Sequence, residues 1–261
     1  MKLSLKVVDK AGQVRAEASA DDELILVYGK EYQDGDQLIL TASESAHVYV
    51  SLEAAMVPSI VFLKESSFGF PIPFGEKRMS YAPQAFLGEC HRLHVRRAAR
   101  FEIGARRNLA LNSLDHHGNQ SLYPHAIANV ETRGESPFAA RNAIDGEKAC
   151  FDHGSWPFTS WGINRDPQAA LTLEFGRPVM ADEVVLYLRA DFPHDAWWER
   201  VSVTFSDGET VDLSLHKSGA AQRFSFVERK IEWLKLHSLV KADDPSPFPA
   251  LTQIEVWGRD L

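Results

Sequence analysis

The sequence predicts an all-β protein made of two β-sandwich (jelly-roll) domains. Many short β-rich segments are bounded by turn residues, and no long stretch carries the period of an amphipathic helix. The pattern of short strands gives way to a loop-rich stretch near residues 104–107. We therefore expect an N-terminal sandwich over residues 1–105 and a second sandwich over residues 106–261. A chain of 261 residues is long enough for two such cores.

In the first domain we expect strands over residues 24–28, 37–41, 48–52, 59–63 and 93–97. Each is rich in β-branched or aromatic residues, and turn signals such as Asp34-Gly35 separate them. The segment 68–75 contains Pro71 and Pro73, which cannot donate to a ladder, so it cannot form a regular central strand.

In the second domain we expect strands over residues 170–175, 183–189, 201–205, 211–215, 222–227, 233–239 and 253–257. The turn Ser206-Asp207-Gly208 joins two of them into a hairpin. Three prolines make residues 241–249 a rigid loop. The stretch 129–161 sustains neither the strand nor the helix period, which indicates long ordered loops of the kind that carry function.

Composition and charge argue against two classes of binding partner, nucleic acids and membranes. The formal net charge of -8 argues against a nucleic-acid partner. No apolar run approaches the roughly 18 residues that span a bilayer, so no membrane is expected, and the N-terminus lacks signal-peptide features, so we expect a cytoplasmic protein. Cys90 and Cys150 are expected to be free thiols. The oligomeric state stays open, a homo-oligomer included.

Five motifs occur in order in the second half: Asn108-Leu109-Ala110, Ala143-Ile144-Asp145-Gly146, Trp161, Leu173-Glu174-Phe175-Gly176 and Ile254-Glu255-Val256-Trp257-Gly258. With them, residues 106–261 resemble the coagulation factor V/VIII type C (discoidin) domain and the family 32 carbohydrate-binding modules. That resemblance implies a galactose-binding-like jelly roll for the second domain. It also implies a non-catalytic carbohydrate-binding protein that recognises its sugar through loops at one end of the second sandwich.

The resemblance further implies a structural Ca²⁺ ion with Asp145 and Glu255 as side-chain ligands, since hard cations need several oxygen atoms. The alternative is that Asp145 caps a turn and that Glu255 pairs with a nearby Arg or Lys.

For the sugar site we expect Trp197 or Trp198 as a flat platform, with polar contacts from Arg189, Asp191, His194 and Asp195. Arg189 best matches the residue that contacts ligand in the resembled modules. The alternative is that one Trp is core and the charged residues pair among themselves.

The stretch 129–161 is expected to add a second wall to this site. Its candidate ligand-binding residues are Glu131, Arg133, His153 and Trp156. The alternative is a network of buried ion pairs that holds long loops in place.

Two rival functions stay open. The first is a glycan-active enzyme that uses paired carboxylates, and the second is a protein-interaction module. No G-x-S-x-G elbow or zinc motif is present, and a non-catalytic role is favoured.

Overall fold

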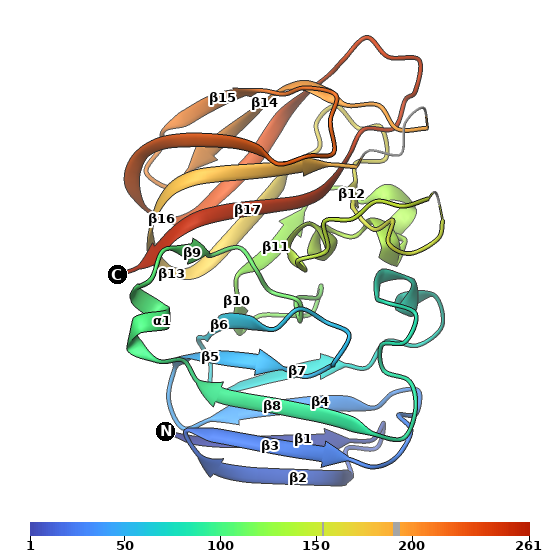
Figure 1. Cartoon of the computed structure of the whole chain (residues 1–261), viewed down its shortest axis with the longest axis vertical. Coiled ribbons are helices and arrows are strands. Elements are labelled where there is room, and N and C mark those ends of the chain that lie inside the picture. The colour runs from blue at the N-terminus through green and yellow to red at the C-terminus, as the bar shows by residue number, and fades with distance from the viewer. Residues whose placement is uncertain (153, 190–193) are drawn as a thin grey trace.

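The structure is a computed structural model and describes residues 1–152, 154–189 and 194–261. Strands make up nearly all of its regular elements, and they form two units stacked along the long axis of the molecule (Figure 1). The all-β prediction with two sandwiches is therefore confirmed.

The first unit packs two antiparallel sheets face to face. Four strands form one sheet in the order β2-β1-β4-β7, and five form the other in the order β10-β6-β5-β8-β3. The strands of the first sheet are β1 (Lys2–Val8), β2 (Val14–Asp21), β4 (Gln37–Ala42) and β7 (Ser67–Pro71). The second sheet holds β3 (Glu23–Tyr28), β5 (Ala46–Ser51), β6 (Ser59–Leu63), β8 (His91–Arg97) and β10 (Leu122–Tyr123).

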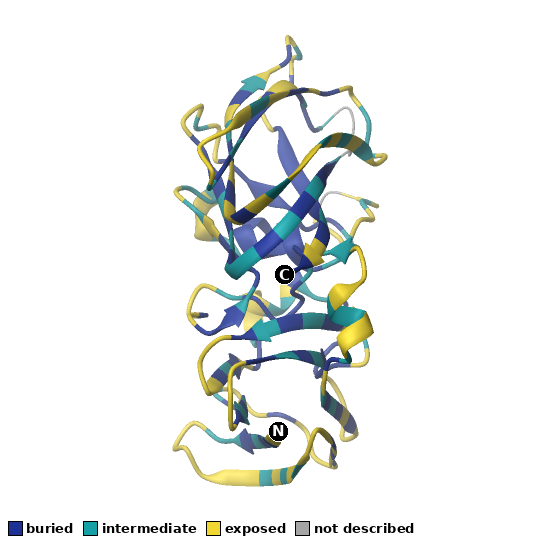
Figure 2. Cartoon of the chain, turned by 90° about the vertical axis from the view of Figure 1, so that its left-hand side faces the viewer, coloured by how far each residue is buried: buried dark blue, intermediate teal, exposed yellow. Residues whose placement is uncertain are grey.

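Alternation of side chains fixes which face of each strand is buried. In β3 the buried residues Leu24, Leu26 and Tyr28 alternate with exposed ones. The proline-bearing segment forms β7 at the edge of its sheet, where a missing N–H costs no ladder bond. Strand β2, which the sequence pattern did not reveal, is the opposite edge and is largely exposed (Figure 2).

The second unit is one antiparallel sheet of eight strands that bends around its own core. Its main path runs β12-β17-β13-β16-β14-β15, while β11 pairs with β13 and β9 pairs with β17. The strands are β9 (Arg107–Asn108), β11 (His125–Ala128), β12 (Trp161–Gly162), β13 (Leu171–Leu188), β14 (Trp198–Phe205), β15 (Thr210–Ser214), β16 (Gln222–Lys241) and β17 (Ala250–Asp260).

The long strands β13 and β16 each combine two of the expected strands. Their pairing shifts register between Glu174 and Val179 and again between Ala181 and Glu183. Such irregularities bend a strand without ending it, so the two halves of one strand can lie on different sides of the core that the bent sheet encloses. The bent sheet encloses a core that includes Trp161, Phe175 and Trp198.

Short helical elements connect the strands. In the first unit η1 (Gly75–Ser80) follows β7, and α1 (Arg100–Gly104) ends at the expected boundary near residue 105. In the second unit the non-periodic stretch contains η2 (Thr132–Gly134), η3 (Ser136–Phe138) and η4 (Ala140–Ile144). No helix in the described part of the chain is long and apolar enough to cross a membrane.

The chain returns to the first unit after α1. Leu122 in β10 pairs with Leu63 in β6, and both Leu114 and Leu122 lie in the first core. His116 Nε2 also lies 2.9 Å from the carbonyl of Gly69. Residues 109–124 therefore pack on both units, and the two sandwiches share an interface that the sequence boundary did not predict. Cys90 and Cys150 are free, as expected.

Candidate functional site

A cavity of about 390 Å³ lies where three loops of the second unit meet at the start of β17. In the ladder between β12 and β17, Gly162 lies opposite Ala250. On the other side of β17, the N–H of Arg189 donates to the carbonyl of Ala250 at 3.0 Å. The residues that follow Gly162, precede Ala250 and follow β13 are therefore brought together. The lining residues are Thr132, Arg133, Phe138, Gly162, Ile163, Asn164, Arg165, Arg189, His194, Phe248, Pro249 and Ala250.

A close approach between η2 and the loop after β12 shapes one wall of the cavity. A Cβ atom on Gly162 would lie 2.5 Å from Thr132 Oγ1, so only glycine fits there. The Thr132 hydroxyl accepts a hydrogen bond from the N–H of Asn164 at 2.9 Å. These contacts hold η2 against the loop after β12, and the two segments carry Arg133 and Arg165.

Arg189 is held from behind the cavity. Its Nε lies 3.6 Å from Oδ2 of Asp195, and its guanidinium carbon lies 5.8 Å from the centroid of the Phe138 ring. The side chains of Arg189 and Asp195 are both buried, yet Arg189 contributes to the cavity lining. A buried and packed guanidinium is a pre-organised donor group.

The proline-rich loop supplies the aromatic wall. His194 stacks on Phe248 with a centroid separation of 5.5 Å and an interplanar angle of 10°. His194 Nδ1 lies 2.9 Å from Asp195 Oδ1, and the hydroxyl of Ser246 donates to the carbonyl of His194. Phe248 still exposes 44% of its surface, which leaves apolar ring area at the cavity.

The structure brings together only part of the predicted ligand set. Arg133, Arg189 and His194 line this cavity, and Asp195 lies beneath it and positions Arg189 and His194. Asp191 and His153 lie outside the described residues.

Neither tryptophan of the predicted platform lines the cavity. Trp198 exposes 1% of its surface and packs near Trp161 in the core, so its ring cannot stack on a sugar. Trp197 is half-buried and packs against the same core. Register shifts between Trp198 and Ser202 interrupt the alternation of β14, and Trp198 therefore lies on the core side together with Val201 and Val203.

Glu131 lines a neighbouring cavity of about 340 Å³ beside β11. Its carboxylate lies 2.8 Å from His117 Nε2 and accepts the N–H of Ala140 at 2.7 Å. Burial alone would raise the pKa of Glu131, but these two hydrogen bonds outweigh it and the pKa is lowered. The bond to Glu131 in turn raises the pKa of His117. This pair matches the alternative in which charged residues brace the loops.

Trp156 packs against the core of the first unit and therefore belongs to the interface between the units. Beside it, Arg141 is buried and its guanidinium lies 4.7 Å from the centroid of the Tyr81 ring. Arg141 donates to the carbonyls of Asp115 and Ser113, both at 3.0 Å.

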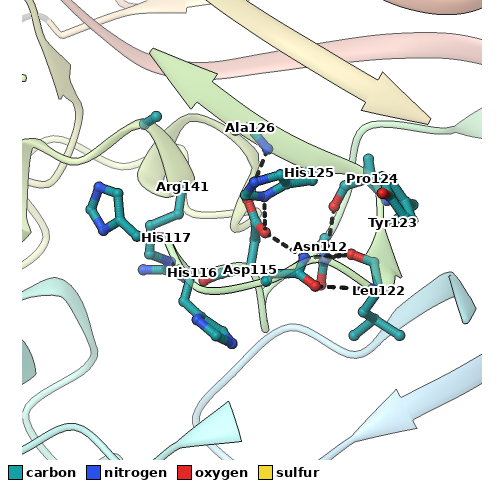
Figure 3. A network of polar contacts seen from close by, with 12 residues as sticks. Asn112, Asp115, His116, His117, Leu122, Tyr123, Pro124, His125, Ala126 and Arg141 are labelled. Carbon is teal, nitrogen blue, oxygen red and sulfur yellow. Dashed lines mark hydrogen bonds and ion pairs between the residues drawn. The ribbon is translucent and has the colours of Figure 1, made fainter. Parts of the chain in front are cut away.

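Asp115 is the centre of the neighbouring polar network (Figure 3). Its Oδ1 lies 2.7 Å from His125 Nδ1 and accepts from the amide of Asn119, while its Oδ2 accepts the N–H of Ala126 at 2.9 Å. The network fixes the segment that joins the two units.

A larger groove of about 840 Å³ runs between the two units. The first unit contributes Phe70, Lys77 and Tyr81, and the second contributes His117 and Arg133 among others. Arg133 therefore lies between this groove and the cavity beside Phe248.

The expected calcium ligands have other partners. Glu255 is buried, pairs with the ammonium group of Lys148 and accepts the indole N–H of Trp257 at 2.8 Å. Asp145 caps a turn by accepting the N–H of Glu147 at 2.9 Å and lies 3.6 Å from Arg141. Among the described residues no group of three or more His, Cys, Asp or Glu could hold a metal ion. With these partners the two carboxylates do not fit the oxygen shell that Ca²⁺ requires, so the calcium expectation rests on the resemblance alone.

Sequence reasoning missed Phe248, Arg165 and Phe138. An aromatic residue inside a rigid proline-rich loop was the available signal for Phe248, because a fixed loop can present an exposed ring. Arg165 and Phe138 had no local signal, since their role depends on the register between β12 and β17.

Comparison with known proteins gives one family and several structures. A family described as a domain of unknown function (DUF7402) matches residues 123–244. No curated protein matches the chain. Three similar structures are sugar-binding modules by their descriptions.

One is chitosan-binding module 1 of a chitosanase/glucanase from Paenibacillus sp. IK-5, with 19% identity over 58% of this chain and 99% of the module, and a TM-score of 0.41. Another is the family 32 module of NanJ from Clostridium perfringens in complex with galactose, with 14% identity, 51% and 91% coverage, and a TM-score of 0.39. The third is the fucose-binding module SpX-3 from Streptococcus pneumoniae, with 15% identity, 57% and 96% coverage, and a TM-score of 0.42.

Proposed function

We propose that this protein is a non-catalytic carbohydrate-binding protein and that its ligand enters the cavity beside Phe248. The observation that carries the proposal is the composition of the cavity wall. An exposed aromatic ring lies next to donors that packing holds in place, in a cavity of about 390 Å³. Small-molecule sites in proteins commonly have this size and this mixture of apolar surface with a few fixed polar groups.

A pyranose presents an apolar face of C–H groups and a rim of hydroxyl groups. The ring of Phe248 suits the apolar face, and its stacking with His194 fixes its orientation. Arg189, Asn164 and Thr132 offer donors or acceptors to the hydroxyls. Because Asp195 and the Phe138 ring restrain Arg189, little side-chain entropy is lost when it binds.

The test is a glycan array followed by calorimetry on the whole chain. Phe248→Ala should weaken binding of any sugar that the array identifies by at least about tenfold. Phe101→Ala removes an equally large exposed ring from α1 and should leave affinity unchanged. Absence of any sugar binding at millimolar concentration would refute the proposal.

The described geometry favours binding over hydrolysis at this cavity. A glycosidase needs two carboxyl groups roughly 5 to 10 Å apart, and no described carboxylate lines the cavity. Turnover of aryl glycosides by the purified protein would reverse this preference.

A further inference from the structure

The described side chains that line the cavity beside Phe248 carry a charge opposite to that of the protein as a whole. The chain carries a formal net charge of -8. Yet Arg133, Arg165, Arg189 and His194 line this cavity, and no carboxylate does so among the described residues. A guanidinium group that no carboxylate balances gives a small cavity a local positive field, which a neutral sugar does not require.

The three arginines differ in how their charge is balanced. Arg189 lies against Asp195 and is buried, so it is neutralised within the protein. Arg133 pairs with Glu135 at 2.6 and 2.8 Å, but this pair is exposed and therefore weak. Arg165 is exposed, lies 5.7 Å from the centroid of the Phe248 ring, and forms no ion pair with a described carboxylate. Arg165 therefore brings to the mouth of the cavity a charge that no described carboxylate pairs with.

Backbone conformation supports a role for the same positions. Arg133, Asn164 and Arg165 have φ angles of 54°, 49° and 59°, in the left-handed region. They are three of the six non-glycine residues with positive φ in the described chain. Such conformations are unfavourable for side chains with a Cβ atom and concentrate at ligand sites. The hydrogen bond from Asn164 to Thr132 holds this conformation and keeps both arginines on one wall.

We propose that the cavity binds an acidic sugar, and that Arg165 is the specificity-determining residue that pairs with its acid group. A planar guanidinium can donate two parallel N–H bonds to a carboxylate or a sulfate. Arg133 can leave its exposed partner and join the contact. The proposal rests on the proposed carbohydrate-binding function and adds the chemical class of the ligand.

Matched pairs of sugars test the charge alone. The methyl glycosides of galacturonic acid and of galactose differ only at C6, where the first has a carboxylate and the second a hydroxymethyl group. The corresponding glucuronate and glucose glycosides form a second pair, and galactose 6-sulfate distinguishes a sulfate from a carboxylate. Calorimetry on the whole chain should show that at least one acidic sugar binds about tenfold tighter than its neutral partner. Added NaCl should weaken only the acidic ligand.

Variants then assign the effect. Arg165→Gln should remove the difference in affinity between the acidic sugar and its neutral partner. Arg165→Lys should retain part of the preference for the acidic sugar, because it keeps the positive charge but loses the two parallel N–H donors of the guanidinium group. Arg92→Gln removes an exposed charge from β8 in the first unit and should change neither affinity. The salt dependence of the unmodified protein keeps the test decisive if Arg165→Gln fails to fold.

The outcomes separate the two proposals. Equal affinity for acidic and neutral sugars overturns the acidic-ligand proposal and leaves carbohydrate binding intact. Failure of every sugar to bind overturns carbohydrate binding and this proposal with it. Equally tight binding of acetate or phosphate shows an anion site without sugar recognition and also overturns the acidic-sugar proposal.

Discussion

The carboxylate of Asp195 lies 3.6 Å from Nε of Arg189, and the two side chains expose 0% and 4% of their surface. The same carboxylate contacts His194, which stacks on Phe248. One buried acid thus orients two of the groups that line the cavity. Its role is to position them, since Asp195 itself does not line the cavity.

Asp195→Asn should lower the free energy of unfolding by about 3 kcal/mol, because it removes a buried carboxylate that faces the guanidinium of Arg189. Urea denaturation measures this loss. Asp243→Asn removes an exposed carboxylate of the same unit and should have little effect. Equal stability of the two variants would mean that Asp195 does not balance Arg189.

His117 and Glu131 should titrate as a pair. The bond to Glu131 raises the pKa of His117 above 6.5, so the pair stabilises the fold fully below pH 6.5 and the contribution is lost as pH rises through the raised pKa. Glu131→Gln should shift the NMR titration of His117 to lower pH, and Glu209→Gln should not. An unchanged titration in Glu131→Gln would contradict the pairing.

Asp145 should make stability fall as pH rises towards neutrality. Burial raises its pKa to about 7 from 3.8, although Arg141 opposes the shift. Between these values the folded state binds one proton more than the unfolded state, so the stabilising contribution is present below pH 3.8 and is lost as pH rises through about 7. Relative to Asp145→Asn, the unmodified protein should lose up to about 1.4 kcal/mol per pH unit in this window. Urea unfolding at pH 5 to 8 measures the difference, and parallel profiles would exclude this effect.

Leu122→Ala should destabilise the protein by about 3 kcal/mol, because Leu122 is fully buried in the first core although it follows the sequence boundary. Ile127→Ala, at a half-exposed position of β11, should cost much less. Thermal or urea unfolding compares the two. A small loss for Leu122→Ala would show that residues 109–124 are not needed to complete the first unit.

Calcium should leave the unfolding temperature unchanged, because Lys148 already supplies a positive charge to Glu255. Differential scanning fluorimetry with Ca²⁺ or a chelator tests this directly. A saturable rise in the unfolding temperature that Glu255→Gln abolishes would restore the calcium expectation.

Local pattern predicted most strands but not their continuity. The expected strands 170–175 and 183–189 form the single strand β13, because register shifts bend it without a loop. The segments around Leu24 and Ile254 were predictable because apolar residues there fit a strand. Strand β2 was not, because Ala alternates there with charged and small polar residues.

The sequence by itself determined the all-β class and named Arg133, Arg189 and His194 as candidate site residues. These follow from local composition and from short motifs. Only the tertiary structure decided that Trp198 is core and that Phe248 and Arg165 join the cavity. The physical reason is the pairing of Gly162 with Ala250, which joins loops about 90 residues apart through hydrogen bonds that no local pattern encodes.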